Sequence, residues 1–304
     1  MLEIDPTMPH SLSDAKPFAW AGIALMIPAG WETSQLDHGY ALLEYQFRPV
    51  MELKTATIRG RFSFQRHLKQ LVPSGHKQPS PQLTLTSLPS EWPLFPATTD
   101  VQAFTWQGAH ISGQGLLVYC HHCRRATLIQ FFDHGGHGPA DIPQVLASFK
   151  DHVNPPEPTF AVYDIQATLP ARLILTRFQF DAGRFELVFH HSRETLTLWR
   201  WSPADLILER CGKKLEEVVQ DNALLPPTVP LEDGQRIDHG MAWQWPAKDY
   251  RSRLRRFFGH PANHPVHALR IWHRPDTNRL LAIKAEGIET FDAFNRICTS
   301  YGTI

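Results

Sequence analysis

The chain has 304 residues, with 30 basic and 30 acidic side chains, so its formal net charge at neutral pH is zero. A chain without net charge has no overall field that would attract nucleic acid or an anionic membrane, and composition therefore favours neither partner. The length is large for a single core and natural for two domains of about 150 residues each.

Targeting signals and cysteine content predict the compartment. The sequence contains no run of 18 apolar residues, and its first residues, Met1 to Pro6, lack the basic start and apolar core of a signal peptide. Four cysteines in a chain without such a signal are typical of reduced thiols in a cytoplasm. We therefore expect a cytoplasmic protein of bacterial type that does not enter a membrane.

The predicted elements occur twice in the same order. The first half predicts, in chain order, strands at 20–29, 40–47 and 51–58, a helix ending at 67–72, a strand at 104–106, a hairpin at 116–122 and 125–132, and a closing helix at 142–149. The second half predicts strands at 162–171, 185–189 and 195–201, a helix ending at 214–219, a strand at 243–245, a hairpin at 267–273 and 279–285, and a closing helix at 291–301. This repetition predicts one structural plan used twice.

The periods of these segments predict an α+β fold of two tandem repeated domains, each an antiparallel β-sheet with flanking helices. Polar and apolar residues alternate at 194–201, as expected for a strand with one packed face and one wet face. We place the first repeat at 1–153 and the second at 159–304. The residues between them, 154–158, form a proline-rich linker.

Each half resembles a known fold at the level of short motifs. The sequence Ile27-Pro28-Ala29-Gly30-Trp31 follows a strand, and the first half closes with a helix ending in Ser148-Phe149. This arrangement resembles the Mog1/PsbP-like fold, an αβα sandwich shared by DcrB-like bacterial proteins and by adaptor chaperones of type VI secretion effectors. The second half departs from the motif, with Pro170-Ala171-Arg172-Leu173 in place of Pro-x-Gly-Trp. The resemblance implies a non-catalytic binding, assembly or chaperone role.

Two pairs of metal-ligand residues lie in the first half. Cys120 and Cys123 are spaced as Cys-x-x-Cys, and His134 and His137 follow as His-x-x-His, which together can form a tetrahedral Cys2His2 zinc site. In an extended strand, however, Cys120 and Cys123 would point to opposite faces, so only a turn would bring them together. The second half builds its hairpin at 273–278 without cysteines. A turn with free thiols is therefore the alternative, and a thioredoxin-like role is disfavoured because no helix follows.

A basic stretch occurs only in the second half, at 248–258. On a strand, Arg251, Arg253 and Arg255 share one face, and Arg256 adjoins them, so this stripe could meet nucleic acid, another anion or an acidic partner. The alternative is a solvated edge strand whose charges prevent aggregation, and the neutrality of the chain favours this alternative.

Aromatic pairs and catalytic motifs complete the interpretation. The tryptophan pairs 199/201 and 243/245 have strand spacing that places each pair on one face, which predicts packing beneath a helix rather than a ligand cage.

The chain has no Gly-x-Ser-x-Gly, Walker-type, His-Glu-x-x-His or dinucleotide motif. We therefore expect a non-catalytic binding or adaptor protein with a protein partner and, apart from the zinc alternative, no cofactor.

Overall fold

The computed structural model of this chain describes residues 15–69, 82–133, 141–151, 157–246, 266–288 and 290–304. The chain divides into two compact units. Unit 1 comprises Met1–Pro155, Thr159–Asp164 and Ile304, and unit 2 comprises Pro156–Pro158 and Ile165–Thr303. Residues Thr159–Asp164 thus group with unit 1, although they follow the proline-rich linker.

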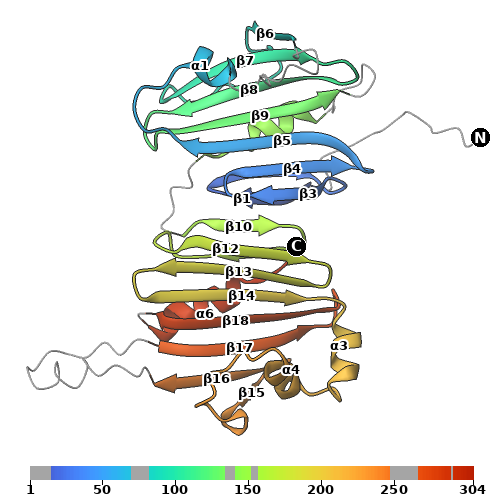
Figure 1. Cartoon of the computed structure of the whole chain (residues 1–304), viewed down its shortest axis with the longest axis vertical. Helices are drawn as coiled ribbons and strands as arrows, with labels where there is room; N and C mark the ends of the chain where they lie inside the picture. The colour runs from blue at the N-terminus through green and yellow to red at the C-terminus, as the bar shows by residue number, and fades with distance from the viewer. Residues whose placement is uncertain (1–14, 70–81, 134–140, 152–156, 247–265, 289) are drawn as a thin grey trace, which may run out of the picture. The chain divides into compact units, whose positions relative to one another are not determined.

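Unit 1 is built mainly from antiparallel strands, coloured blue to green in Figure 1. Its main sheet has seven strands in the order β3-β4-β5-β9-β8-β7-β6. Strand β1 pairs with β2 and β10 beside this sheet. The elements are β1 (Ala15–Trp20), β2 (Ile23–Pro28), β3 (Glu32–Asp37), β4 (Tyr40–Tyr45), β5 (Arg48–Thr57), α1 (Phe64–Lys69), β6 (Gln82–Thr86), β7 (Thr99–Gln107), β8 (Ser112–Cys120), β9 (Arg125–Asp133), α2 (Ile142–Ala147) and β10 (Thr159–Val162).

Unit 2, coloured yellow to red in Figure 1, also has a seven-stranded antiparallel sheet, in the order β12-β13-β14-β18-β17-β16-β15. Strand β11 pairs with the short β19. The elements are β11 (Ile165–Thr168), β12 (Ile174–Asp181), β13 (Arg184–His191), β14 (Glu194–Trp201), α3 (Ala204–Arg210), α4 (Leu215–Asp221), the 3-10 helix η2 (Leu231–Asp233), β15 (Gln235–Ile237), β16 (Gly240–Pro246), β17 (Val266–Arg274), β18 (Arg279–Ile288), α6 (Phe291–Ser300) and β19 (Gly302–Thr303).

The two seven-stranded sheets have the same strand order when their strands are compared along the chain. In each, three consecutive strands form a meander at one side and four consecutive strands form a meander at the other. The meanders meet in a single ladder, β5 with β9 in unit 1 and β14 with β18 in unit 2. The chain is therefore predominantly an antiparallel β-protein with a few short helices.

The predicted first strand, 20–29, is interrupted at its start. Ala21 has φ 51° and Gly22 has φ 78°, so the chain turns there and Trp20 ends the preceding strand β1. The sequence analysis missed β1 because its residues carry no clear alternation. The five-strand start of unit 1 is thus longer than the three strands expected before the first helix.

Strand β14 lacks the wet face that its alternating sequence predicted, and that expectation is wrong. All of its residues except Thr195 are buried, including Glu194 and Arg200. The reason is that helices cover both faces of this sheet. Ile271 of β17 packs in the core with α3 and α4, whereas its neighbour Trp272 packs edge-to-face on Tyr301, next to α6, with ring centroids 5.8 Å apart.

The buried polar groups of β14 have partners. Arg172 Nε donates to Glu194 Oε2 at 2.8 Å, and the guanidinium of Arg200 lies 4.3 Å from the centre of the Phe185 ring. The tryptophan prediction is confirmed, because Trp199, Trp201 and Trp243 are buried in one apolar core to which α3 and α4 contribute.

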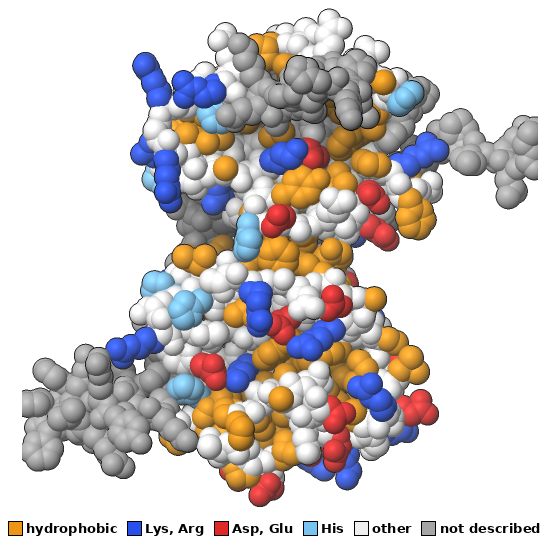
Figure 2. All heavy atoms as spheres, viewed as in Figure 1, with side chains coloured by type: hydrophobic (Ala, Val, Ile, Leu, Met, Phe, Trp, Pro, Cys, Tyr) orange, Lys and Arg blue, Asp and Glu red, His pale blue; other side chains and the backbone are white. Residues whose placement is uncertain are grey.

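Charged side chains of both signs mix on the surface of unit 2 (Figure 2). On strands β12 and β13, Arg177 and Arg184 both contact Glu186, at 2.5 Å and 2.9 Å. Such neighbouring opposite charges largely cancel each other, in keeping with the zero net charge of the chain.

Candidate metal centre at the β8–β9 turn

The Cys-x-x-Cys sequence forms the turn of a hairpin. Strand β8 ends at Cys120, β9 begins at Arg125, and the two residues pair across the ladder. The residues between them form the turn, and Arg124 closes it with φ 56°. Because the chain reverses here instead of remaining extended, Cys120 and Cys123 do not point to opposite faces. This turn is what a site shared by the two thiols requires.

Three potential ligand atoms converge beside this turn. The Sγ atoms of Cys120 and Cys123 and a carboxylate oxygen of Asp151 all lie within 4.8 Å of one another. Cys123 Sγ lies 4.0 Å from Asp151 Oδ2. Cys120 is buried, and the other two residues are half-buried. We call these three residues the thiol site.

The main chain around Asp151 is held by two neighbouring strands. Lys150 and Ala24 exchange N–H to O hydrogen bonds of 2.9 Å in both directions, which ties the segment after α2 to strand β2. On the other side, Arg125 Nη1 donates to the main-chain oxygen of Asp151 at 3.3 Å. These contacts position the carboxylate from elements that are distant in the sequence.

The surroundings of Cys120 favour the protonated thiol when no cation is present. The pKa of Cys120 is raised to about 11. Burial is the largest cause, side-chain hydrogen bonds with Asp151 and Cys123 also raise it, and main-chain hydrogen bonds from Cys123 and His122 lower it. A bound cation reverses this preference, because a metal ion binds the thiolate and releases the proton.

The donor set fits a thiophilic divalent ion. Thiolates bind zinc at about 2.3 Å, so two thiolates on one tetrahedral ion lie about 3.8 Å apart. The atoms of the thiol site are close to this spacing and need only small side-chain movements to reach it. Two thiolates and one carboxylate are ligands that zinc accepts, and the set leaves a fourth position for another ligand or water.

The neighbouring His121 has a different partner. Its Nε2 lies 2.8 Å from Asp100 Oδ2 on strand β7, and its ring packs edge-to-face on Tyr119. This contact is exposed to solvent. His121 therefore holds the turn to the next strand and is not one of the converging ligands.

Several predicted site residues lie outside the described part of the chain. These are His134 and His137 of the zinc prediction and Arg251, Arg253, Arg255 and Arg256 of the basic stretch. Of the predicted zinc ligands, the described structure brings together Cys120 and Cys123. Asp151 was missed, because it lies 28 residues from Cys123 and no sequence spacing links the two.

Comparison with known proteins adds no assignment, since no family model and no curated protein matches the chain. Among the residues that the structure describes, no helix has the length and apolar character needed to span a bilayer.

Proposed function

We propose that the protein is a non-catalytic metal-binding protein whose first unit holds a zinc ion at the thiol site. The observation that supports this proposal is the convergence of Cys120, Cys123 and Asp151 within 4.8 Å. Zinc is favoured over magnesium or calcium, which prefer oxygen ligands alone.

The role of the ion follows from the elements that it joins. Cys120 and Cys123 belong to the β8–β9 turn, whereas Asp151 follows α2 and is bonded to β2 through its neighbour Lys150. An ion bound to all three cross-links these elements, so we expect metal binding to contribute to the folding free energy of unit 1. This is a structural role and requires no substrate.

Metal analysis of untagged full-length protein tests the proposal. We expect one zinc per chain. The Cys120→Ser, Cys123→Ser double variant should lose the zinc, and the Asp151→Asn variant should bind it with lower affinity. Cys211→Ser is the matched control, because Cys211 also lies beside a carboxylate, 3.6 Å from Asp221, but has no second thiol in that pair. No bound metal after reconstitution with zinc, or equal zinc in all variants, would contradict the proposal.

We further propose that the chain is an α+β tandem repeat that serves as an adaptor for a protein partner in the cytoplasm. The identical strand order of the two main sheets supports the repeat. So do two matching turns, in which Trp31 N donates to Pro28 O and Leu173 N donates to Pro170 O, each at 3.0 Å. The resemblance of each half to Mog1/PsbP-like domains supports the αβα sandwich and the adaptor role.

Co-purification from the native host under mild conditions tests the adaptor role. A stable partner should be recovered reproducibly and should bind the purified chain again after separation. Failure to recover a partner, together with turnover of a small molecule by the purified chain, would contradict it.

A further inference from the structure

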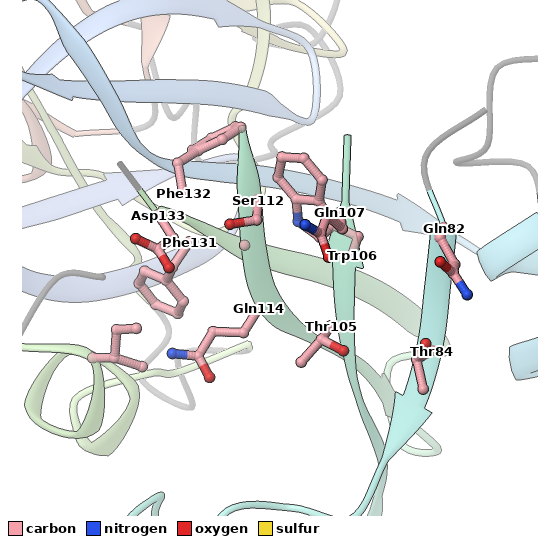
Figure 3. Close-up of a pocket in the computed structure, with 12 residues that line it drawn as sticks. Gln82, Thr84, Thr105, Trp106, Gln107, Ser112, Gln114, Phe131, Phe132 and Asp133 are labelled. Atoms are coloured by element: carbon pink, nitrogen blue, oxygen red, sulfur yellow. The ribbon is translucent and has the colours of Figure 1, made fainter. Parts of the chain in front are cut away.

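A cleft of about 550 Å³ lies on the main sheet of unit 1, at the end of the β8–β9 ladder opposite the thiol site. Strands β6, β7, β8 and β9 form its wall, and Ile142 of α2 closes one side. Its volume falls within the range of about 300–1,000 Å³ that is usual for small-ligand sites. We call it the polar cleft (Figure 3).

Strand register places a set of polar side chains on one face of this sheet. One cross-strand row contains Gln82, Gln107, Ser112 and Asp133, and the next row on that face contains Thr84, Thr105, Gln114 and the buried Phe131. Figure 3 shows Thr84, Thr105 and Gln114 side by side across three neighbouring strands.

The intervening residues of the same strands point to the other face and form its core. Leu83 and Trp106 pack there with Phe104 and with Leu68 of α1. The sheet thus keeps an apolar face beneath α1, while the opposite face at this end carries the polar rows beside the buried Phe131 and Ile142. A polar face that is hollowed into a cleft is suited to bind a polar ligand.

Unused hydrogen-bonding capacity is concentrated in the polar cleft. Asp133 Oδ1 is buried and has no hydrogen-bond partner among the described residues. A buried acceptor without a partner is costly, so a ligand that donates to it gains the interaction without displacing another protein group. The amides of Gln82, Gln107 and Gln114 also line the cleft, and each offers donors and an acceptor.

The charge and polarity of the lining restrict the ligand class. Asp133 is the only charged residue among the lining residues described, and none of them is Lys, Arg or His. The described lining offers no cation to pair with a phosphate or a carboxylate. Amides, hydroxyls and one carboxylate instead match a ligand with many hydroxyl groups, each of which can both donate and accept.

We propose that the polar cleft binds a neutral saccharide, with Asp133 accepting from a ligand hydroxyl and Gln114 and Gln107 bonding to others. This site is independent of the metal centre, because the two lie at opposite ends of the β8–β9 ladder: Ser112 pairs with Asp133 at the cleft, and Cys120 pairs with Arg125 at the thiol site.

Ligand-observed NMR and calorimetry on the full chain test this proposal, with the neutral disaccharides maltose, cellobiose, lactose and N,N′-diacetylchitobiose as probes and the cationic glucosamine as a comparison. We expect at least one neutral disaccharide to bind at millimolar concentration or better. Asp133→Asn and Gln114→Ala should each weaken that binding about tenfold, since the first removes the charge of the accepting oxygen and the second removes an amide that bonds to the ligand. Gln244→Ala, on an exposed position of β16 in unit 2, is the matched control and should bind as the unaltered chain does.

Three outcomes would overturn the proposal. They are no binding by any of the four disaccharides, binding that is unchanged in both cleft variants, and binding of glucosamine but of none of the neutral sugars. Near-UV circular dichroism and zinc content should be unchanged in Asp133→Asn, which separates loss of the ligand from loss of the fold or of the metal.

Discussion

Ser148 Oγ accepts a hydrogen bond from the main-chain N–H of Met26 at 2.7 Å, linking the end of helix α2 to strand β2. The same hydroxyl donates to Val145 O at 2.7 Å within the helix. In unit 2, Ser300 Oγ accepts from the N–H of Thr168 on β11 at 3.0 Å, so the closing helix of each unit is tied to its strand by a serine at the same place. Each serine thus accepts a hydrogen bond from a main-chain N–H that lies outside its own helix.

Replacing either serine should destabilise its own unit. We expect Ser148→Ala and Ser300→Ala each to lower the free energy of unfolding by about 1 kcal/mol, because each loses a hydrogen bond to the main chain. Urea denaturation followed by tryptophan fluorescence measures this. Thr299→Ala is the control, since the exposed Thr299 hydroxyl bonds to Asn295 O within α6 itself. Equal effects for all three variants would show that the serine links do not contribute.

Gly22 is required by two constraints at once. Its φ is 78°, and a Cβ at this position would collide with the guanidinium of Arg125, which donates to the main chain of Asp151. We expect Gly22→Ala to cost more than about 1 kcal/mol of stability and to weaken metal binding as well, because it displaces Arg125. Gly212→Ala is the control: Gly212 has φ 58° but open space around it, so only the backbone strain remains. Equal losses of stability in both variants would show that the collision with Arg125 has no effect.

The four thiols should differ in their rate of alkylation. Cys120, Cys211 and Cys298 are buried and Cys123 is half-buried, so we expect Cys123 to react first. Burial also raises the pKa of Cys298 to about 11, which keeps little thiolate at neutral pH. Peptide mapping by mass spectrometry after brief iodoacetamide treatment of the metal-free protein gives the rates. Added zinc should protect Cys123 and leave the slow labelling of Cys211 unchanged; protection of neither or of both would contradict a site at Cys123.

Stability should fall on the acid side because of two histidines in unit 2. Burial lowers the pKa of His267 and of His273, and for His273 the nearby His239 lowers it further. Below about pH 6.5 the unfolded chain therefore takes up protons more readily than the folded chain, and the free energy of unfolding decreases as pH falls.

Urea denaturation between pH 7.5 and about 5 measures this dependence, a range that spans the ordinary histidine pKa. The double variant His267→Gln, His273→Gln should have a flatter profile over that range, and His190→Gln, at an exposed position, serves as the control. If the free energy of unfolding changes with pH equally in the unaltered chain and in both variants, the acid sensitivity comes from other groups.

The features that could be predicted from the sequence are those that follow from the spacing of apolar residues within a short segment. The hairpin at 116–132, the closing helix near 142–149 and the packing of Trp199 and Trp201 all follow from alternation or helical spacing within a short segment. Antiparallel pairing followed from the same patterns.

Features that depend on distant segments could not be predicted in this way. Burial of both faces of β14 results from helices that pack on opposite sides of the sheet, while the β14 sequence alternates as if one face were wet. Asp151 joins Cys123 only because Lys150 bonds to Ala24 on β2. The polar cleft likewise requires four strands in register, so Asp133 alone gave no signal.

The single ladder between the two meanders of each main sheet has a consequence for the order of folding. Pairs within a meander join strands that are close in the chain, whereas β5 meets β9 through pairs such as Leu53 with Ile129. Closing that long loop costs more chain entropy than forming a hairpin. We expect the meanders to form early and the β5–β9 ladder to set the folding rate of unit 1.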